Sequence, residues 1–258
     1  MNYFVEGLQG SGKSTFVEKL FEKHPECTLI REGDYSPVEL AWCAYLNGKQ
    51  CEEILEKYPD LNSQIKKKTY CEDDHRIVCY TKIRSENRDF YRDLEQYEIY
   101  NGRIPLDRFE EIVLNRYRKW NTEDMIFECS LFQNIVEDMI LFRNLSDEQI
   151  MDFYYQVKKA LYGKTYRIIY LRSDNIEGNI CKIRKERIDE HGNEVWFELM
   201  MEYFGQCPYA KENGCKGESD LIAHLKHRQD LELRICKEIF PECSVILKSK
   251  DYSEEDII

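Results

Sequence analysis

The sequence predicts an α/β fold in which a parallel sheet is flanked by helices. Short apolar runs alternate along the chain with longer segments whose apolar residues recur every three or four positions, and strands separated by helices form parallel sheets. The runs are short and apolar throughout, as in strands that helices cover on both faces. A length of 258 residues fits one domain that carries a substantial insertion.

Each expected strand is a short apolar run bounded by polar or turn-forming residues. The first run ends at a glycine-rich loop, and the run YRIIYL gives the strongest strand signal of the chain. The run HRIVCYTKI predicts one arm of a hairpin. In order, the strands are expected at residues 2–6, 27–31, 75–83, 125–127, 166–171 and 243–247.

The expected helices have apolar residues at helical spacing. In the first helix these are Phe16, Val17, Leu20 and Phe21, and Pro37 suits the first turn of the second. A turn at the Asn-Gly pair 101–102 precedes the next strongly amphipathic segment. The helices are expected at residues 13–23, 36–46, 51–55, 106–120, 147–161, 176–188, 219–239 and 253–258, and another helix follows the strand at 125–127 and continues to about residue 142.

Composition excludes several classes of protein. The chain is 42% hydrophobic with 18 Tyr and 12 Phe, too aromatic for a disordered chain. It carries 49 acidic and 37 basic residues, a net charge of −12, whereas nucleic-acid and anionic-membrane binders usually present basic surface. No run approaches the ~20 apolar residues of a membrane span. With no secretory signal and 11 scattered cysteines, we expect reduced thiols and a cytoplasmic location.

A glycine-rich octapeptide after the first strand is the most informative motif. Residues 7–14, GLQGSGKS, fit the phosphate-binding pattern G-x-x-x-x-G-K-[ST] between a strand and a helix. Glycines let backbone N–H groups approach phosphate oxygens, and the helix N-terminus adds its positive dipole. The nucleotide-binding residues are therefore expected to be Gly7, Gln9, Gly10, Ser11, Gly12, Lys13, Ser14 and Thr15.

The motif assigns chemistry to two of these side chains. Lys13 would place a positive charge on the β- and γ-phosphates of ATP, and the Ser14 hydroxyl would bind Mg²⁺. The sequence has no Asn-Lys-x-Asp guanine-recognition motif, which disfavours a GTPase. Among the remaining classes, a small-molecule kinase fits the length better than a mechanical ATPase.

Two carboxylates follow the second expected strand. Glu32 and Asp34 would lie at the carboxyl end of that strand, where open α/β sheets bind ligands. A kinase needs a carboxylate there to accept the proton of the acceptor hydroxyl. The alternative is that Asp34 only caps the next turn. Either residue could be the base, with a slight preference for Glu32.

The third strand carries a resemblance to a known family. Residues 125–134, MIFECSLFQN, resemble the strand-to-helix segment of deoxynucleoside kinases, a branch of the P-loop nucleoside and nucleotide kinases. Glu128 and Ser130 match the Glu and Ser of that family's Glu-Arg-Ser motif, and Cys129 replaces its arginine. The resemblance implies a P-loop NTPase fold, ATP and Mg²⁺ as cofactors, and Glu128 as a residue that holds the metal with Ser14.

A basic segment resembles the lid of the same family. The strand at 166–171 precedes NIEGNICKIRKER, and family members place arginines of such a helix over the transferred phosphate. The resemblance therefore implies that Arg184 and Arg187, spaced i and i+3, stabilise charge in the transition state. The alternative is a solvated helix face paired with neighbouring acids. The lid region would span residues 176–195.

Together these observations predict a single kinase-like domain with an inserted acceptor-side region at residues 47–120. The expected reaction transfers the γ-phosphoryl group of ATP·Mg²⁺ to a small-molecule acceptor, preferably a nucleoside or nucleotide. One alternative is a kinase for another metabolite or an antibiotic hydroxyl, and another is a nucleotide-dependent regulatory protein without acceptor turnover. We expect no nucleic-acid or membrane partner, and a homodimer is left open.

Overall fold

The computed structural model describes residues 1–257. The chain divides into two compact units, which are described separately. Unit 1 combines Met1–Leu29 with the residues from Asn121 onward, and unit 2 is the continuous segment Ile30–Trp120. Unit 2 begins earlier in the sequence than the acceptor-side region expected from residue 47.

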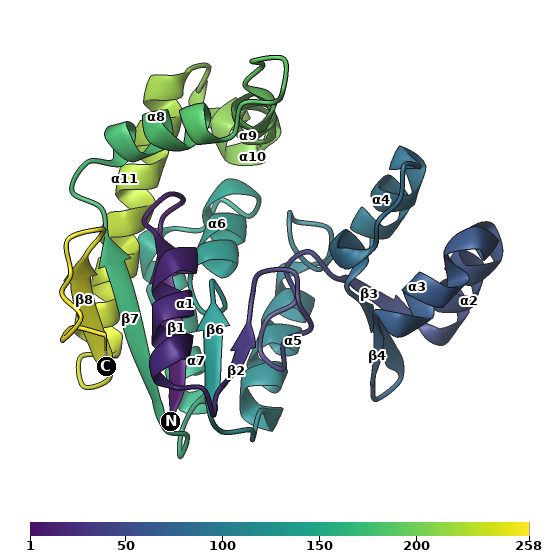
Figure 1. Ribbon diagram of the computed structural model, residues 1–258, viewed down its shortest axis with the longest axis horizontal. Coiled ribbons are helices and arrows are strands. Elements are labelled where there is room, and N and C mark those ends of the chain that lie inside the picture. Colours follow the sequence, from purple (N-terminus) through teal and green to yellow (C-terminus); the bar gives the residue numbers. More distant parts are fainter. Residues whose placement is uncertain (258) are drawn as a thin grey trace. The chain divides into compact units, whose positions relative to one another are not determined.

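Unit 1 is built on a five-stranded parallel sheet, which confirms the expected α/β class (Figure 1). The strand order is β2–β6–β1–β7–β8. The registers place Tyr3 opposite Ile126, Val5 opposite Ile169, and Ile169 in turn opposite Val245. The strands are β1 (Asn2–Gly7), β2 (Thr28–Ile30), β6 (Met125–Glu128), β7 (Tyr166–Arg172) and β8 (Ser244–Lys248).

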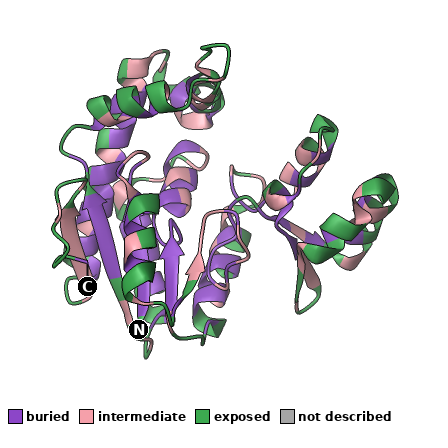
Figure 2. Cartoon of the chain, viewed as in Figure 1, coloured by how far each residue is buried: buried purple, intermediate pink, exposed green. Residues whose placement is uncertain are grey.

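The central strand is buried on both faces because its alternate residues pack against different helices (Figure 2). Helix α1 (Lys13–Lys23) covers one face, and its Phe16 joins the cluster of Val5 and Leu171. On the other face Phe4 stacks on Phe127, and helices α7 and α11 lie behind the sheet (Figure 1). A sheet sandwiched between helices leaves the carboxyl ends of its strands free for the loops.

The remaining helices of unit 1 follow β6 and β7. Helix α7 begins at a capping box in which Ser146 and Gln149 satisfy each other's backbone N–H groups. Within residues 1–257, none of the helices is long and apolar enough to span a bilayer. These elements are α6 (Gln133–Leu141), α7 (Asp147–Ala160), α8 (Ile176–Glu186), α9 (Val195–Gln206), α10 (Pro208–Asn213), α11 (Glu218–Arg234) and the π-helical turn η3 (Ile235–Ile239).

Unit 2 has a sheet and a core of its own. Its antiparallel strands lie in the order β3–β5–β4, and the hairpin of β4 and β5 includes the arm expected at residue 75. Leu46, Ile65, Val78 and Phe90 belong to its buried cluster. The elements are β3 (Ala44–Asn47), α2 (Gly48–Lys57), η1 (Pro59–Leu61), α3 (Asn62–Lys67), β4 (Thr69–Glu72), β5 (His75–Val78), η2 (Tyr80–Lys82), α4 (Arg88–Glu95) and α5 (Leu106–Lys119).

The helix expected at residues 36–46 was wrong. That segment forms turns and then enters β3. The Ser36 hydroxyl accepts the N–H groups of Val38 and Glu39, and the Glu39 carboxylate accepts that of Ala41. Trp42 then adopts a left-handed φ of 63°. Such local side-chain bonds compete with helix formation. The terminal helix expected at 253–258 is also not formed over residues 253–257, and residue 258 lies outside the described residues.

Unit 2 should lose stability as the pH rises, because Glu39 is buried. Burial raises the pKa of this carboxyl from 4.5 to about 8, although Tyr100 and the Ala41 N–H favour the ionised form. The folded state therefore keeps a proton that the unfolded chain releases near pH 4.5. The stability that this protonated carboxyl contributes is lost as the pH rises from 4.5 to 8. We expect the free energy of unfolding in urea to fall over this range.

Replacing Glu39 by glutamine supplies the control for this pH dependence. The introduced amide cannot ionise, but its oxygen can still accept the Ala41 N–H. Between about pH 5 and 8, the free energy of unfolding of the variant should fall by a few kcal/mol less than that of the wild type. Identical pH profiles for the two proteins would contradict the assignment.

Candidate nucleotide site

The glycine-rich loop joins β1 to α1 at the carboxyl edge of the sheet. Gly7, Gly10 and Gly12 have φ values of 140°, 76° and 88°, a region that favours glycine. A Cβ on Gly7 would lie 2.7 Å from the carbonyl oxygen of Leu171 on β7. The sequence therefore has glycine where the backbone turns sharply and where it passes a neighbouring strand.

Lys13 folds back onto this loop. Its Nζ donates to the carbonyl oxygens of Gly7 and Leu8 at 2.8 and 2.9 Å. The side chain is 7% exposed, so a buried ammonium sits inside the turn. These bonds hold the positive charge at the point where the chain passes from strand to helix.

The N-terminus of α1 presents uncapped backbone donors. Its N-cap is Gly12, no side chain caps the first turn, and that turn contains no acidic residue. The first N–H groups of a helix have no acceptor within the helix, and the dipole makes this end positive. Among the described residues, the buried Ser11 Oγ also has no hydrogen-bond partner. Uncapped amides, a lysine and an orphaned hydroxyl together suit an anionic ligand.

Ser14 and Glu128, the two residues expected to hold Mg²⁺, meet at this edge. The Ser14 hydroxyl donates to Glu128 Oε1 at 2.6 Å, joining α1 to the end of β6. A hydroxyl and a carboxylate are oxygen ligands of the kind that Mg²⁺ prefers. Within residues 1–257, no group of three or more acidic, His or Cys side chains could hold a metal ion. The pair fits Mg²⁺ only if phosphate and water oxygens complete the coordination.

The residue after Glu128 has a strained backbone. Cys129 is buried and has a φ of 60°, unusual for a residue with a side chain. Its N–H donates to the Val5 carbonyl oxygen at 3.1 Å. Such strain persists only where surrounding contacts enforce it, and it is common at functional sites. The surroundings of Cys129 thus hold this residue, directly after Glu128, in a conformation that it would rarely adopt by itself.

Helix α8 packs directly on the loop. A Cβ on Gly10 would lie 2.3 Å from Ile183 Cδ1 and 3.5 Å from the Asn179 carbonyl oxygen. Ile183 is itself 6% exposed. Glycine at position 10 is therefore favoured by its φ, and a side chain there would also displace the Ile183 side chain.

Gly10→Ala should consequently destabilise unit 1. It combines the strain of a positive φ with a clash, and we expect a loss of about 1–3 kcal/mol in the free energy of unfolding. Gly163→Ala is the matched control, since Gly163 has a φ of 78° but no atom within 4 Å of its Cβ position. In a protein that already carries Ile183→Ala, the Gly10→Ala substitution should cost less, because the clash is absent. Equal losses in the two single variants would refute the packing argument.

A buried arginine that was not predicted from the sequence binds a side chain of the loop. Arg228 on α11 is fully buried and donates through NH2 to Gln9 Oε1 at 2.9 Å. It also pairs with Glu137 on α6, and its Nε lies 3.3 Å from Glu232 Oε1. Burial opposes ionisation of Glu137, but Arg228 and His224 outweigh it and lower its pKa to about 2.

Glu6 forms a second buried support next to the loop. Its two carboxylate oxygens accept the N–H groups of Leu131 at 2.7 Å and Gln133 at 3.4 Å. Burial raises the pKa of Glu6 to about 7, although the Leu131 N–H and Lys13 favour the ionised form. The strand that leads into the loop is thereby tied to the segment after β6.

The two arginines of the expected lid are engaged in unit 1 in other ways. Arg184 donates to Glu194 at 2.7 Å and to Glu218 at 2.9 Å, and it lies over the Phe197 ring at 4.0 Å. Arg187 lies over the Trp196 ring at 4.8 Å. These contacts join α8 to α9 and α11.

The segment after β8 borders the loop on another side. Ser249 donates through Oγ to the Ser11 carbonyl oxygen at 2.7 Å. Lys250 donates to Asn179 Oδ1 at 3.1 Å, and its Cγ is 3.6 Å from the Cβ position of Gly12. The loop is thus enclosed by α8 and by the chain after the last strand.

Glu32 and Asp34 belong to unit 2. Glu32 Oε1 accepts the Trp42 indole N–H at 2.9 Å, and Asp34 Oδ1 lies 3.2 Å from Lys82 Nζ. Asp34 also accepts the N–H of Arg31, three residues before it, at 3.1 Å. Thr15, the last of the expected nucleotide-binding residues, is an exposed residue of α1.

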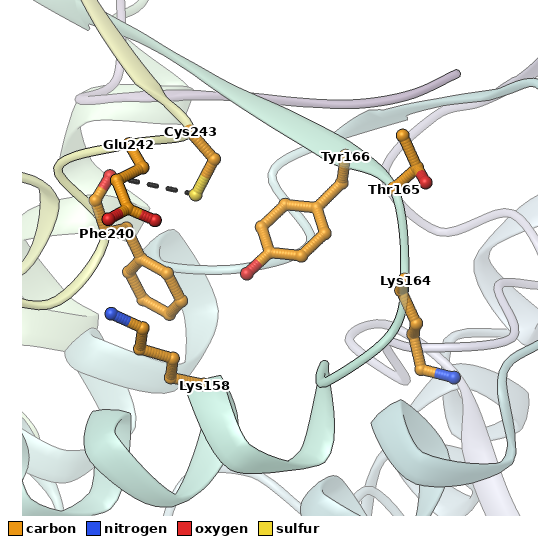
Figure 3. Close-up of a pocket in the computed structure, with 7 residues that line it drawn as sticks. All are labelled: Lys158, Lys164, Thr165, Tyr166, Phe240, Glu242 and Cys243. Atoms are coloured by element: carbon orange, nitrogen blue, oxygen red, sulfur yellow. Dashed lines mark hydrogen bonds between the residues drawn. The ribbon is translucent and has the colours of Figure 1, made fainter.

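A hollow of about 300 Å³ lies at the opposite edge of the sheet, where β7 and β8 begin (Figure 3). Its wall includes Tyr166, Phe240 and Cys243, and the thiol of Cys243 lies 3.7 Å from the carbonyl oxygen of Phe240 (Figure 3). Lys158, also in the wall, donates to the Ile239 carbonyl oxygen at 2.6 Å. This hollow is therefore separate from the glycine-rich loop, which lies at the carboxyl edge of the sheet.

Comparison with known proteins does not assign the chain to a family. A scan against protein-family models finds no match, and a search of curated proteins finds no similar sequence. Functional assignment rests on the fold, the loop and its surroundings.

Proposed function

We propose that the protein is an ATP-dependent phosphotransferase that acts on a small-molecule acceptor. The observation that carries this proposal is the arrangement at the start of α1: an uncapped helix N-terminus, the Lys13 ammonium, and Ser14 against Glu128. Binding of a nucleoside triphosphate with its metal uses each of these features. The parallel sheet supports them at the edge where such folds bind ligands.

In this proposal each side chain has a separate task. Lys13 exchanges its bonds to Gly7 and Leu8 for phosphate oxygens, and the loop amides bind the same phosphates. Ser14 and Glu128 hold Mg²⁺, which offsets charge between the β- and γ-phosphates when it is bound. Glu32 or Asp34 accepts the acceptor proton. A nucleoside or nucleotide remains the favoured acceptor because of the resemblance at Glu128 and Ser130.

A nucleotide-dependent regulatory protein is the second candidate. Arg184 is paired with two carboxylates, and Cys129 is not a basic residue. Transfer of a phosphoryl group depends on cations around the γ-phosphate, whereas binding alone depends less on them. The observation that favours this alternative is that Arg184 already forms ion pairs with Glu194 and Glu218.

One experiment separates the two candidates. ADP release from ATP·Mg²⁺ is measured with deoxynucleosides, ribonucleosides, their monophosphates and aminoglycoside-like alcohols, and ATP binding is measured by calorimetry. Stimulation by one acceptor class supports the kinase. ATP binding without stimulation by any acceptor supports the regulatory protein, and absence of ATP binding overturns both.

A further inference from the structure

Two cysteines of unit 2 face each other at the end of its sheet. Ala44 on β3 is opposite Val78 on β5 in an antiparallel pair, so the same register places Cys43 opposite Cys79. Their sulfur atoms are 3.6 Å apart. The pair joins the end of the loop that contains Glu32 to the start of η2.

The backbone bonds identify the type of pair. The Cys43 N–H donates to the Leu40 carbonyl oxygen at 3.1 Å, and the Cys79 N–H donates to that of Lys68 at 3.0 Å. Neither donates to the other, so this is a non-hydrogen-bonded cross-strand position. Facing Cα atoms are about 4.5 Å apart at such positions, within the range of roughly 4.4–6.8 Å that a disulfide bridges.

The two thiols differ chemically. The Cys43 thiol donates to the Cys79 sulfur, and this bond lowers the pKa of Cys79. The same bond and burial raise the pKa of Cys43. Cys79 is therefore the better thiolate, and the thiolate is the form that reacts with oxidants. Both residues are 1% exposed, so an oxidant that reaches them must be small, and hydrogen peroxide is close to water in size.

We propose that Cys43 and Cys79 are a peroxide-sensitive pair that closes reversibly to a cross-strand disulfide. The Cys79 thiolate attacks hydrogen peroxide, the O–O bond breaks, and the leaving hydroxide takes a proton to become water. Cys43 then loses its proton and attacks the sulfenic sulfur of Cys79, which releases the second water. Two thiols lose two electrons in total, and one peroxide is reduced to two waters. A small-molecule thiol reverses the reaction by exchange.

The disulfide would tie together segments that already contact each other around the two carboxylates. Trp42, next to Cys43, donates to Glu32, and Lys82 of η2 pairs with Asp34. A covalent bond at the base of this loop limits the positions that Glu32 and Asp34 can adopt. The inference depends on the sheet register of unit 2 and does not require the proposed phosphotransfer.

The test is peptide mapping of the full chain after graded oxidation. The protein is treated with hydrogen peroxide, its remaining thiols are alkylated under denaturing conditions, and non-reduced peptides are analysed by mass spectrometry. We expect a Cys43–Cys79 cross-link that lacks two hydrogens, about 2 Da, and that disappears with dithiothreitol. Oxidation of the exposed Cys71 and Cys181, with Cys43 and Cys79 still alkylated, would overturn the proposal.

Variants extend the test to stability. Cys51→Ala is the matched control, because Cys51 is a buried cysteine of the same unit. Oxidation should raise the unfolding midpoint of the wild type and of this control by several degrees. Cys43→Ala and Cys79→Ala should show no such rise. A cross-link between either residue and another cysteine would also reject the pairing.

Discussion

Lys13→Ala should weaken ATP binding by roughly 10–100-fold, because a charged hydrogen bond to phosphate is lost. Any acceptor-dependent ADP release should fall by roughly 100-fold or more, since the same charge would act in the transition state. The ammonium now donates to the Gly7 and Leu8 carbonyl oxygens of the loop, so a phosphate can replace those acceptors. Calorimetry with ATP·Mg²⁺ and the ADP assay measure the two effects.

Lys19→Ala provides the control for this variant. Lys19 lies on the same helix but pairs with the exposed Glu254, and its replacement should leave both measurements unchanged. Far-ultraviolet circular dichroism establishes that each variant is folded. A folded Lys13→Ala protein with wild-type ATP affinity would remove the main support for the proposed site.

Arg228→Met should cost about 3–5 kcal/mol of unfolding free energy, because removing one partner of a buried ion pair leaves uncompensated charge. The guanidinium is fully buried among Glu137, Glu232 and Gln9. The loop also loses the donor that holds Gln9, so ATP affinity should decrease as well. Urea denaturation measures the first effect and calorimetry the second.

Two further variants test the origin of this loss. Arg228→Met combined with Glu232→Gln should recover part of the stability, because the introduced amide is neutral and can still accept the bond that Tyr170 now donates to Glu232. Arg234→Met should change stability by less than about 1 kcal/mol, since Arg234 forms exposed ion pairs with Glu238 and Asp147. A loss at Arg234 as large as at Arg228 would contradict the role of burial.

The parts of the fold that the sequence predicted well have strong periodicity. Helix α1 begins and ends at the expected residues 13 and 23, and α5 and β7 differ from expectation by one residue. The segment at 36–46 was also expected to be helical, but the Ser36 and Glu39 side chains bind its N–H groups. Hydropathy patterns do not contain this competition between side chain and backbone.

The candidate site was predictable where it depends on strand ends. Ser14 and Glu128 meet because β1 and β6 are parallel neighbours. The support from Arg228 was not predicted, since it lies far along the chain from Gln9. A signal existed nevertheless: Arg228 and Glu232 are four residues apart on a helix that also carries Leu221 and Leu225, and charged residues among leucines on one helix face indicate a buried pair.

The division of the chain into a continuous and a discontinuous unit has a consequence for folding. Strand β1, which leads into the loop, pairs with β6 and β7. Asn2 therefore pairs with Tyr166, which is far from it in the sequence. Unit 2 is uninterrupted from Ile30 to Trp120 and can form during synthesis. The central strand of unit 1 can pair on one edge once β6 has been made, but pairing on its other edge must wait until β7, which ends at Arg172, has been made. Contacts of such long sequence separation are slow to form, so β1, which precedes the other strands of this sheet in the sequence, is among the last to be paired on both edges.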